Sequence, residues 1–150
     1  MQNFLVVVEC AIEHDGKFLV IKRPENVHAA GLLAFPGGKV EYTDGADNHD
    51  ILIQAIKRET FEEVGLNLID PIQFLTSSYF IDSHHVPVLD VIFHCKLKNT
   101  KVEISASSRE VPEYYWLSIN EIFAHEKTPV WLKRYLSKIA PLPTLQVQTG

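Results

Sequence analysis

Several residue types are scarce in this sequence, and each shortage excludes a class of protein. Its 150 residues include two cysteines, Cys10 and Cys95, which form no CxxC pair, and we interpret them as reduced core thiols of a cytoplasmic protein. No apolar run approaches the ~18 residues of a membrane span, and the start of the chain lacks the basic lead of a signal peptide. Acidic residues outnumber basic ones, 19 to 14, so a basic surface for nucleic acid is not expected.

The rest of the composition is that of a globular protein. Hydrophobic residues make up 46% of the chain and charged residues 22%, which is enough to bury a core. The length suits a single domain over residues 1–150, in which we expect the Pro- and Gly-containing tail 141–150 to be frayed. The net charge of −5 does not exclude a small anionic substrate, because metal cations can lie between an acidic protein and a diphosphate.

β-Branched residues and turn motifs predict a series of strands. An Asp15-Gly16 turn joins the first two strands into a hairpin. A short strand ends at Ala34-Phe35, cut off by Pro36-Gly37-Gly38, and another begins at Val40. The other expected strands cover residues 4–12, 17–23, 67–80, 86–97 and 114–117, and residues 43–50 are expected to form an exposed loop.

Three helices are predicted between and after these strands. Residues 51–64 contain no Gly or Pro, Gly65 stands where a helix stop is expected, and Asp50 or Asn48 caps the start. A capping box over residues 118–121 opens a short helix. Thr128-Pro129 provides a cap and a first-turn proline for a last helix that ends at about residue 140. This order of elements indicates a mixed sheet covered by helices.

The predicted helix over residues 51–64 contains a cluster of acidic residues near its end. Glu59, Glu62 and Glu63 stand at i, i+3 and i+4, so their carboxylates share one face and repel one another. Divalent cations, which take oxygen ligands, would offset that repulsion. Arg58 precedes Glu62 by four residues, which is the spacing of a helical ion pair. The alternative interpretation is a solvated acidic face.

The two glycines before this helix are the second informative feature. Gly37 and Gly38 permit positive φ and a close approach of the backbone. Between a strand and a helix, they would let a loop wrap tightly under bound metal and phosphate. The alternative is a simple turn.

Together these segments resemble the signature of the Nudix hydrolases. Its left half matches as Gly38-Lys39-Val40-Glu41, and its right half matches over residues 58–66, with Thr60 in place of an aliphatic residue. About six residues are inserted between the halves. Asp44 or Asp50 therefore stands where the family has its first glutamate, and which of them takes its supporting role stays open.

The resemblance implies a fold and an activity. The expected fold is of the α/β (α+β) class, an α/β/α sandwich around a mixed β-sheet. The expected enzyme is a hydrolase that cleaves the phosphoanhydride bond of a nucleoside diphosphate linked to another group. Its substrate would be an NTP or dNTP, with a nucleotide sugar or ADP-ribose second, and a homodimer is expected by resemblance. The alternatives are a non-catalytic nucleotide-binding module and an isoprenoid diphosphate isomerase, which would need Cys10 or Cys95 as a proton donor.

The resemblance also implies roles for particular residues. Mg²⁺, with Mn²⁺ as a substitute, would be bound by Glu59, Glu62, Glu63 and the carbonyl of Gly38, and Arg58 would complete the catalytic group. The substrate phosphates would meet Lys22, Arg23, Gly37, Gly38 and Lys39. The general base would be Glu62 or Glu63, or Glu110 or Glu113 from outside the signature.

Overall fold

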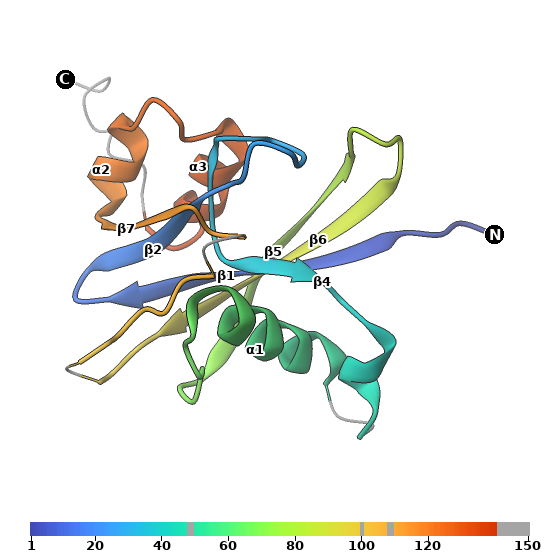
Figure 1. Ribbon diagram of the computed structural model, residues 1–150, viewed down its shortest axis with the longest axis horizontal. Coiled ribbons are helices and arrows are strands. Elements are labelled where there is room, and N and C mark those ends of the chain that lie inside the picture. The colour runs from blue at the N-terminus through green and yellow to red at the C-terminus, as the bar shows by residue number, and fades with distance from the viewer. Residues whose placement is uncertain (48–49, 100, 108–109, 141–150) are drawn as a thin grey trace.

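The centre of the molecule is a seven-stranded mixed sheet with helices on both faces (Figure 1). The computed structural model describes residues 1–47, 50–99, 101–107 and 110–140, so the tail 141–150 and Asn48 lie outside the described residues. The strands are β1 Leu5–His14, β2 Lys17–Lys22, β3 Leu33–Ala34, β4 Gly37–Lys39, β5 Ile72–Ile81, β6 Pro87–Lys96 and β7 Glu113–Leu117.

Strand β1 lies at the middle of the sheet, and its two edges are used differently. One edge pairs with β6 in parallel from Leu5 to Glu13, and β5 follows β6 in antiparallel pairing. The other edge pairs with β2 only beside the Asp15-Gly16 turn, where Glu13 faces Phe18. Further along, β3 replaces β1 on this edge of β2, and β4 takes the place of β2 against β1. Strand β7 pairs with the opposite edge of β2 from Phe18 to Lys22. The sheet is therefore split between β1 and β2, and β4 enters at the split.

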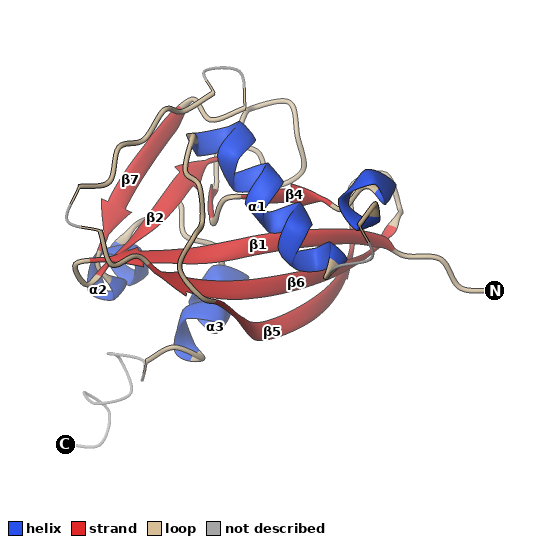
Figure 2. Ribbon diagram, turned by 90° about the horizontal axis from the view of Figure 1, so that it is seen from below, coloured by secondary structure: helices blue, strands red, loops and turns tan. Residues whose placement is uncertain are grey.

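The helices complete a three-layer arrangement. Helix α1, Ile51–Val64, covers one face, and α2, Ile119–Ala124, and α3, Val130–Ser137, cover the other (Figures 1 and 2). One core lies under α1, where Ala55 and Ile56 pack with Val8. A second core lies under α3, where Leu136 packs with Ala11. The predicted α/β/α sandwich is confirmed.

Helix α1 begins and ends where the sequence predicts. Its buried residues include Ala55, Ile56, Thr60 and Val64, which recur at the spacing of one helix face. Asp50 caps the first turn by accepting a hydrogen bond from the Ile53 N–H at 3.3 Å. Gly65 ends the helix in the left-handed region, at φ 72°.

Some predicted boundaries were wrong. The strand expected from residue 67 begins only at Ile72, because Leu68 turns into the core and is 3% exposed. Thr128 does not cap α3, since its hydroxyl donates to the Ile122 carbonyl at 2.6 Å and Pro129 occupies the N-cap position. The last helix ends at Ser137. Within the loop expected over residues 43–50, a 3₁₀ helix forms at Tyr42–Gly45.

Candidate active site

Gly37 and Gly38 lie in strand β4, which the sequence did not predict. The expected strand start at Val40 was wrong, since the pairing with β1 runs from Gly37 to Lys39. Neither glycine has a positive φ, so the reason for glycine is close approach alone. A Cβ on Gly37 would overlap the backbone of Val8 in β1. A Cβ on Gly38 would overlap the carboxylate of Glu59.

The three glutamates of α1 have different environments around β4. Glu63 is fixed, because its Oε1 accepts a hydrogen bond from the Gly37 N–H at 2.7 Å. The side chain of Glu59 is 14% exposed and lies against Gly38. The side chain of Glu62 is 52% exposed. Arg58 links Glu59 and Glu62, because its Nη1 donates to Glu59 Oε1 at 2.9 Å and to Glu62 Oε2 at 3.2 Å.

Asp44 holds Arg58 from the other side. The guanidinium donates from Nε to Oδ1 at 2.7 Å and from Nη2 to Oδ2 at 2.9 Å, and Nη2 also donates to the Lys39 carbonyl at 3.0 Å. Asp44 Oδ2 in turn accepts from the Glu41 N–H at 2.8 Å. The sequence left open whether Asp44 or Asp50 takes the supporting role. In the structure Asp44 binds Arg58, whereas Asp50 caps α1.

The electrostatics of the cluster follow from burial. Burial, with the charges of Glu59 and Glu110 nearby, raises the pKa of Glu63 to about 8, although the Gly37 N–H and Arg23 act in the opposite direction. Burial likewise raises the pKa of Glu59, against the lowering effect of Arg58. The Arg58 guanidinium holds the pKa of Asp44 below its usual range. Burial therefore favours the neutral forms of Glu59 and Glu63, whereas Arg58 keeps Asp44 charged.

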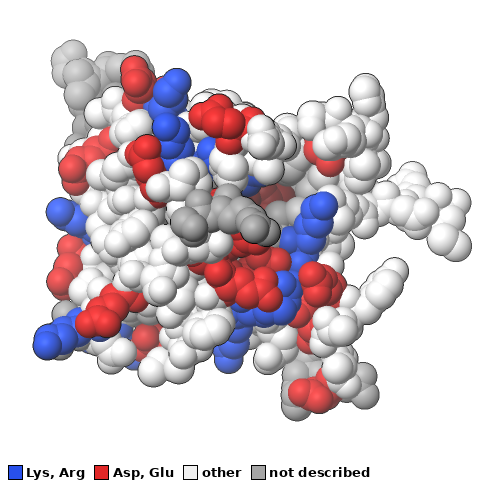
Figure 3. All heavy atoms as spheres, in the orientation of Figure 1, with Lys and Arg blue, Asp and Glu red and all other residues white. Residues whose placement is uncertain are grey.

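This donor set fits a hard divalent cation. Carboxylate and main-chain carbonyl oxygens are the ligands that such ions take, and the glycine at position 38 keeps the space beside Glu59 free of a side chain. As they stand, no three acidic, histidine or cysteine side chains of the described residues converge closely enough to hold an ion. Arg58 and the Gly37 N–H engage the carboxylates instead. Figure 3 shows acidic side chains gathered over α1 and β4, with basic ones beside them.

The basic residues predicted to meet phosphate lie in different places. Arg23 follows β2, donates from Nε to the His28 carbonyl at 2.6 Å, and its charge lowers the pKa of Glu63. Lys39 ends β4 and its side chain is exposed. Lys22 points elsewhere, because its Nζ lies 3.7 Å from a carboxylate oxygen of Glu113.

The two outside candidates for the general base are also distinguished. The charge of Glu110 raises the pKa of both Glu59 and Glu63, so Glu110 lies close to the cluster. Glu113 has other partners. It is engaged by the Tyr115 hydroxyl and by Lys22, which together lower its pKa.

Sequence reasoning missed a second acidic pair. Glu9 in β1 and Asp90 in β6 lie on the same face of neighbouring strands, and Asp90 is 3% exposed. The Tyr135 hydroxyl of α3 lies 3.4 Å from Asp90 Oδ2 and 2.7 Å from Ser78 Oγ. The sequence did contain a sign of this pair, because Glu9 and Asp90 each interrupt an apolar strand segment. Burying a carboxyl group in such a segment is costly.

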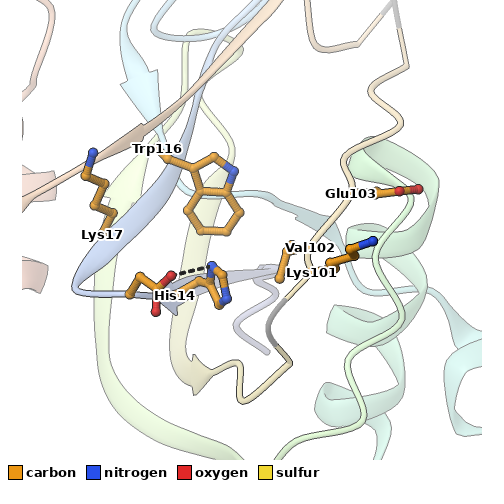
Figure 4. A pocket seen from close by; sticks show the side chains of 7 residues that line it. His14, Lys17, Lys101, Val102, Glu103 and Trp116 are labelled. Atoms are coloured by element: carbon orange, nitrogen blue, oxygen red, sulfur yellow. Dashed lines mark ion pairs between the residues drawn. The ribbon is translucent and has the colours of Figure 1, made fainter.

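A separate pocket of about 530 Å³ lies at the turn end of β1 and β2. Its lining residues are His14, Asp15, Lys17, Lys101, Val102, Glu103 and Trp116 (Figure 4). His14 is tied down here, because its Nε2 lies 2.6 Å from the Asn99 carbonyl oxygen. None of the residues predicted to act in catalysis lines this pocket, so it belongs to another part of the surface.

Comparison with known proteins gives three kinds of likeness. A family model described as "NUDIX domain" matches residues 4–139. The CTP pyrophosphohydrolase of Escherichia coli K12 is 36% identical over 92 residues, which are 61% of this chain but only 58% of that protein. Phosphatase NudJ of the same strain is 28% identical over 117 residues, 78% of this chain and 70% of that protein. The crystal structure of a MutT protein from Methanosarcina mazei Go1 matches with a TM-score of 0.75 at 24% identity, over 91% of this chain and 93% of that one.

No helix of the described residues is both long and apolar enough to cross a membrane. Cys10 and Cys95 are free and buried.

Proposed function

Because this chain belongs to the Nudix family of hydrolases, we propose that it is a divalent-metal-dependent pyrophosphohydrolase acting on nucleoside triphosphates. The observation that carries the proposal is the position of Glu59 and Glu63 against the two glycines of β4. Burial raises the pKa values of these carboxylates, and divalent cations beside them would favour the charged forms again.

We assign a separate role in the proposed reaction to each group of residues. Glu59, Glu62, Glu63 and the Gly38 carbonyl would hold Mg²⁺ or Mn²⁺, which supplies charge neutralisation at the diphosphate and a lowered pKa for the attacking water. Arg58, fixed by Asp44, orients Glu59 and Glu62. Glu110 is our candidate for accepting the proton of the water, because its charge already acts on Glu59 and Glu63.

Arg23 and Lys39 are the proposed contacts of the substrate phosphates, together with the main chain of Gly37 and Gly38. Arg23 is favoured over Lys22 because it lies close enough to affect the pKa of Glu63, whereas Lys22 is drawn to Glu113. Among substrates, nucleoside triphosphates come first and CTP is the first to try, since one relative is named a CTP pyrophosphohydrolase. Nucleotide sugars and ADP-ribose follow.

The isomerase alternative is disfavoured by both thiols. Cys10 and Cys95 are 0% exposed and pack in the core under α1, so neither is placed to donate a proton to a substrate. These reduced thiols also support the cytoplasm as the proposed compartment.

The decisive test is cleavage of a nucleotide panel with Mg²⁺, followed by ion-exchange separation of the products. The panel holds the NTPs and dNTPs, ADP-ribose, UDP-sugars, NADH and diadenosine polyphosphates. Wild type should cleave at least one member, and the double variant Glu62→Gln, Glu63→Gln should lose that activity. Glu126→Gln, an exposed acid between α2 and α3, is the matched control and should retain it. Failure to cleave any member with Mg²⁺ or Mn²⁺ would favour the non-catalytic binding module.

A further inference from the structure

Strand β5 forms an open edge of the sheet. It is the last strand beyond β6, and Figure 2 shows it along the margin of the sheet. Within the described part of the chain no strand pairs with its outer edge, so one row of main-chain N–H and C=O groups along Ile72–Ile81 has no strand partner. Such a row can pair with a further strand.

This edge lacks the features that usually prevent such pairing. Edge strands of native proteins commonly carry charged side chains or proline, or are very short. The ten residues of β5 include no Asp, Glu, Lys, Arg, Pro or Gly. The one irregularity is at Leu75, where the register with β6 shifts, and regular pairing continues on both sides of it. The outer edge of β5 is therefore open to pairing over most of its length.

Aromatic side chains are exposed along the same edge. The β6 residues opposite Phe74 and Tyr79 are Phe93 and Leu89, which pack in the core under α1, so both rings lie on the α1 face of the sheet. Helix α1 itself packs mainly on β1 and β4. Phe74 is consequently 64% exposed and Tyr79 58% exposed. Phe4, which meets the Tyr79 ring edge-on with ring centres 5.9 Å apart, is 47% exposed.

We propose that two copies of this chain form a dimer by pairing their β5 strands in antiparallel fashion. A two-fold axis between Thr76 and Ser77 places Phe74 of each copy opposite Tyr79 of the other. Each Tyr79 ring then lies between Phe4 of its own copy and Phe74 of the other copy. Because β4 lies on the other edge of β1, this pairing leaves the candidate active site open, and it does not depend on the proposed hydrolysis.

This register agrees with the main-chain geometry of β5. Opposed residues of an antiparallel pair share a face, and both are hydrogen-bonded to one another or neither is. The β6 partners of Phe74 and Tyr79, Phe93 and Leu89, are four residues apart, so the two rings have the same face and the same hydrogen-bonding phase. The same holds for the residues at the two ends of the strand, Ile72 and Ile81. Only the two residues at the axis oppose across faces, because they are neighbours in the strand.

The exposed area supports a dimer of moderate strength. An aromatic side chain buries about 150–250 Å² when it is fully covered, so the exposed parts of Phe4, Phe74 and Tyr79 amount to about 250–400 Å² in each copy. The rings of two copies thus supply about 500–800 Å², which is about half of the ~1,200 Å² of the smallest standard interface. The main chain and the other side chains of β5 add to this area. We therefore expect a dimer that dissociates on dilution.

Sedimentation velocity of the full-length protein tests the dimer. Wild type should move from the mass of one chain, 17.0 kDa, towards twice that mass as its concentration rises. Phe74→Glu and Tyr79→Glu should each raise the dissociation constant by about 100-fold or more, because each change acts twice across the axis. Tyr114→Glu, which alters an exposed aromatic residue of β7, is the matched control and should leave the dissociation constant unchanged.

A charge exchange tests the register. The double variant Phe74→Glu, Tyr79→Lys places a glutamate of each copy opposite a lysine of the other. It should associate about tenfold more tightly than Phe74→Glu alone, because opposite charges attract across neighbouring strands. A double variant that associates no better than Phe74→Glu overturns the pairing of these two positions.

Hydrogen exchange of wild type at low and high protein concentration needs no variant to fold. The amides of β5 should exchange more slowly at the higher concentration, and those of β7 should not change. Three results overturn the proposal: the mass of one chain at every concentration, a dimer that both folded glutamate variants retain, or protection that is confined to another strand. Circular dichroism and the melting temperature show whether each variant is folded.

Discussion

Asp44 and Arg58 are joined by two parallel hydrogen bonds, Nε to Oδ1 at 2.7 Å and Nη2 to Oδ2 at 2.9 Å. This two-pronged geometry is the strongest form of carboxylate–guanidinium pairing. The Asp44 side chain is 4% exposed, and the Arg58 side chain extends from it to Glu59 and Glu62. Asp44 therefore positions the carboxylates of α1 through Arg58, whereas Asp50 acts on the helix end alone.

We predict that the two aspartates have separable effects. Asp44→Asn should lower kcat/KM by about 10- to 100-fold, as loss of a group that orients metal ligands does, and should also lower the melting temperature because the ion pair with Arg58 is lost. Asp50→Ala should instead cost about 1 kcal/mol of the free energy of unfolding through loss of the cap, and leave kcat/KM near wild type. Steady-state kinetics and urea unfolding of both variants check this. Equal kinetic losses would contradict the division of roles.

The close contact of Gly38 with Glu59 predicts a loss of activity without a loss of fold. In Gly38→Ala the three atoms nearest to the new Cβ all belong to the end of the Glu59 side chain, which can move away. A shift of about 1 Å in a positioned group costs about 10²-fold in rate, so kcat/KM should fall by that order. Gly45→Ala is the matched control, because the atoms nearest to its Cβ belong to the Ile51 side chain, with Cδ1 at 3.2 Å. Retention of full activity in Gly38→Ala would show that the space beside Glu59 is not needed.

The pKa of Glu63 predicts how the stability of the metal-free protein depends on pH. Its pKa is about 8 in the folded protein, against about 4.3 in an unfolded chain. The folded state thus prefers the neutral form, and stability falls as pH rises from about 4.3 to about 8, by about 1.4 kcal/mol per unit of pKa difference. Glu63→Gln stays neutral and still accepts from Gly37.

In EDTA, the melting temperature of Glu63→Gln should therefore exceed that of wild type by a margin that grows between pH 5 and pH 8.5. Addition of Mg²⁺ at pH 8 should stabilise wild type more than the variant. A margin that does not change with pH would contradict the raised pKa of Glu63.

The positions of Glu110 and Glu113 predict unequal kinetic effects. Glu110→Gln should lower kcat by about 10²-fold or more, as loss of a general base does, and should remove the acidic limb of the kcat profile against pH. Glu113→Gln should change kcat little, because Glu113 is engaged by Tyr115 and Lys22. The pH profiles of both variants make the comparison. A large loss in Glu113→Gln alone would reverse the assignment.

Thr60 is the position where α1 departs from the aliphatic residue of the signature, and it predicts a stabilising change. Its side chain is 0% exposed and its hydroxyl has no partner among the described residues. Thr60→Val keeps the shape and removes the unsatisfied hydroxyl, so the free energy of unfolding should rise by about 1 kcal/mol. Denaturant unfolding measures this, and a decrease would mean that the hydroxyl is satisfied in solution.

The sequence alone determined the features that depend on neighbours along the chain. The bounds of α1 followed from its unbroken run between Asp50 and Gly65, and the first hairpin from Asp15-Gly16. The common face of the three glutamates followed from the helical repeat. These are local properties, because hydrogen bonds within a helix or a tight turn join residues at most four positions apart.

Only the tertiary structure decided the contacts that cross the sheet. Gly37 and Gly38 form a strand because β1 offers a free edge where β2 turns away, which no residue near position 37 reveals. Glu9 and Asp90 meet because β1 and β6 pair in parallel in one register, and a shift of one residue would send one of them to the other face. Register and strand order depend on how the whole chain packs, so the residues that share a site across strands cannot be identified from local pattern.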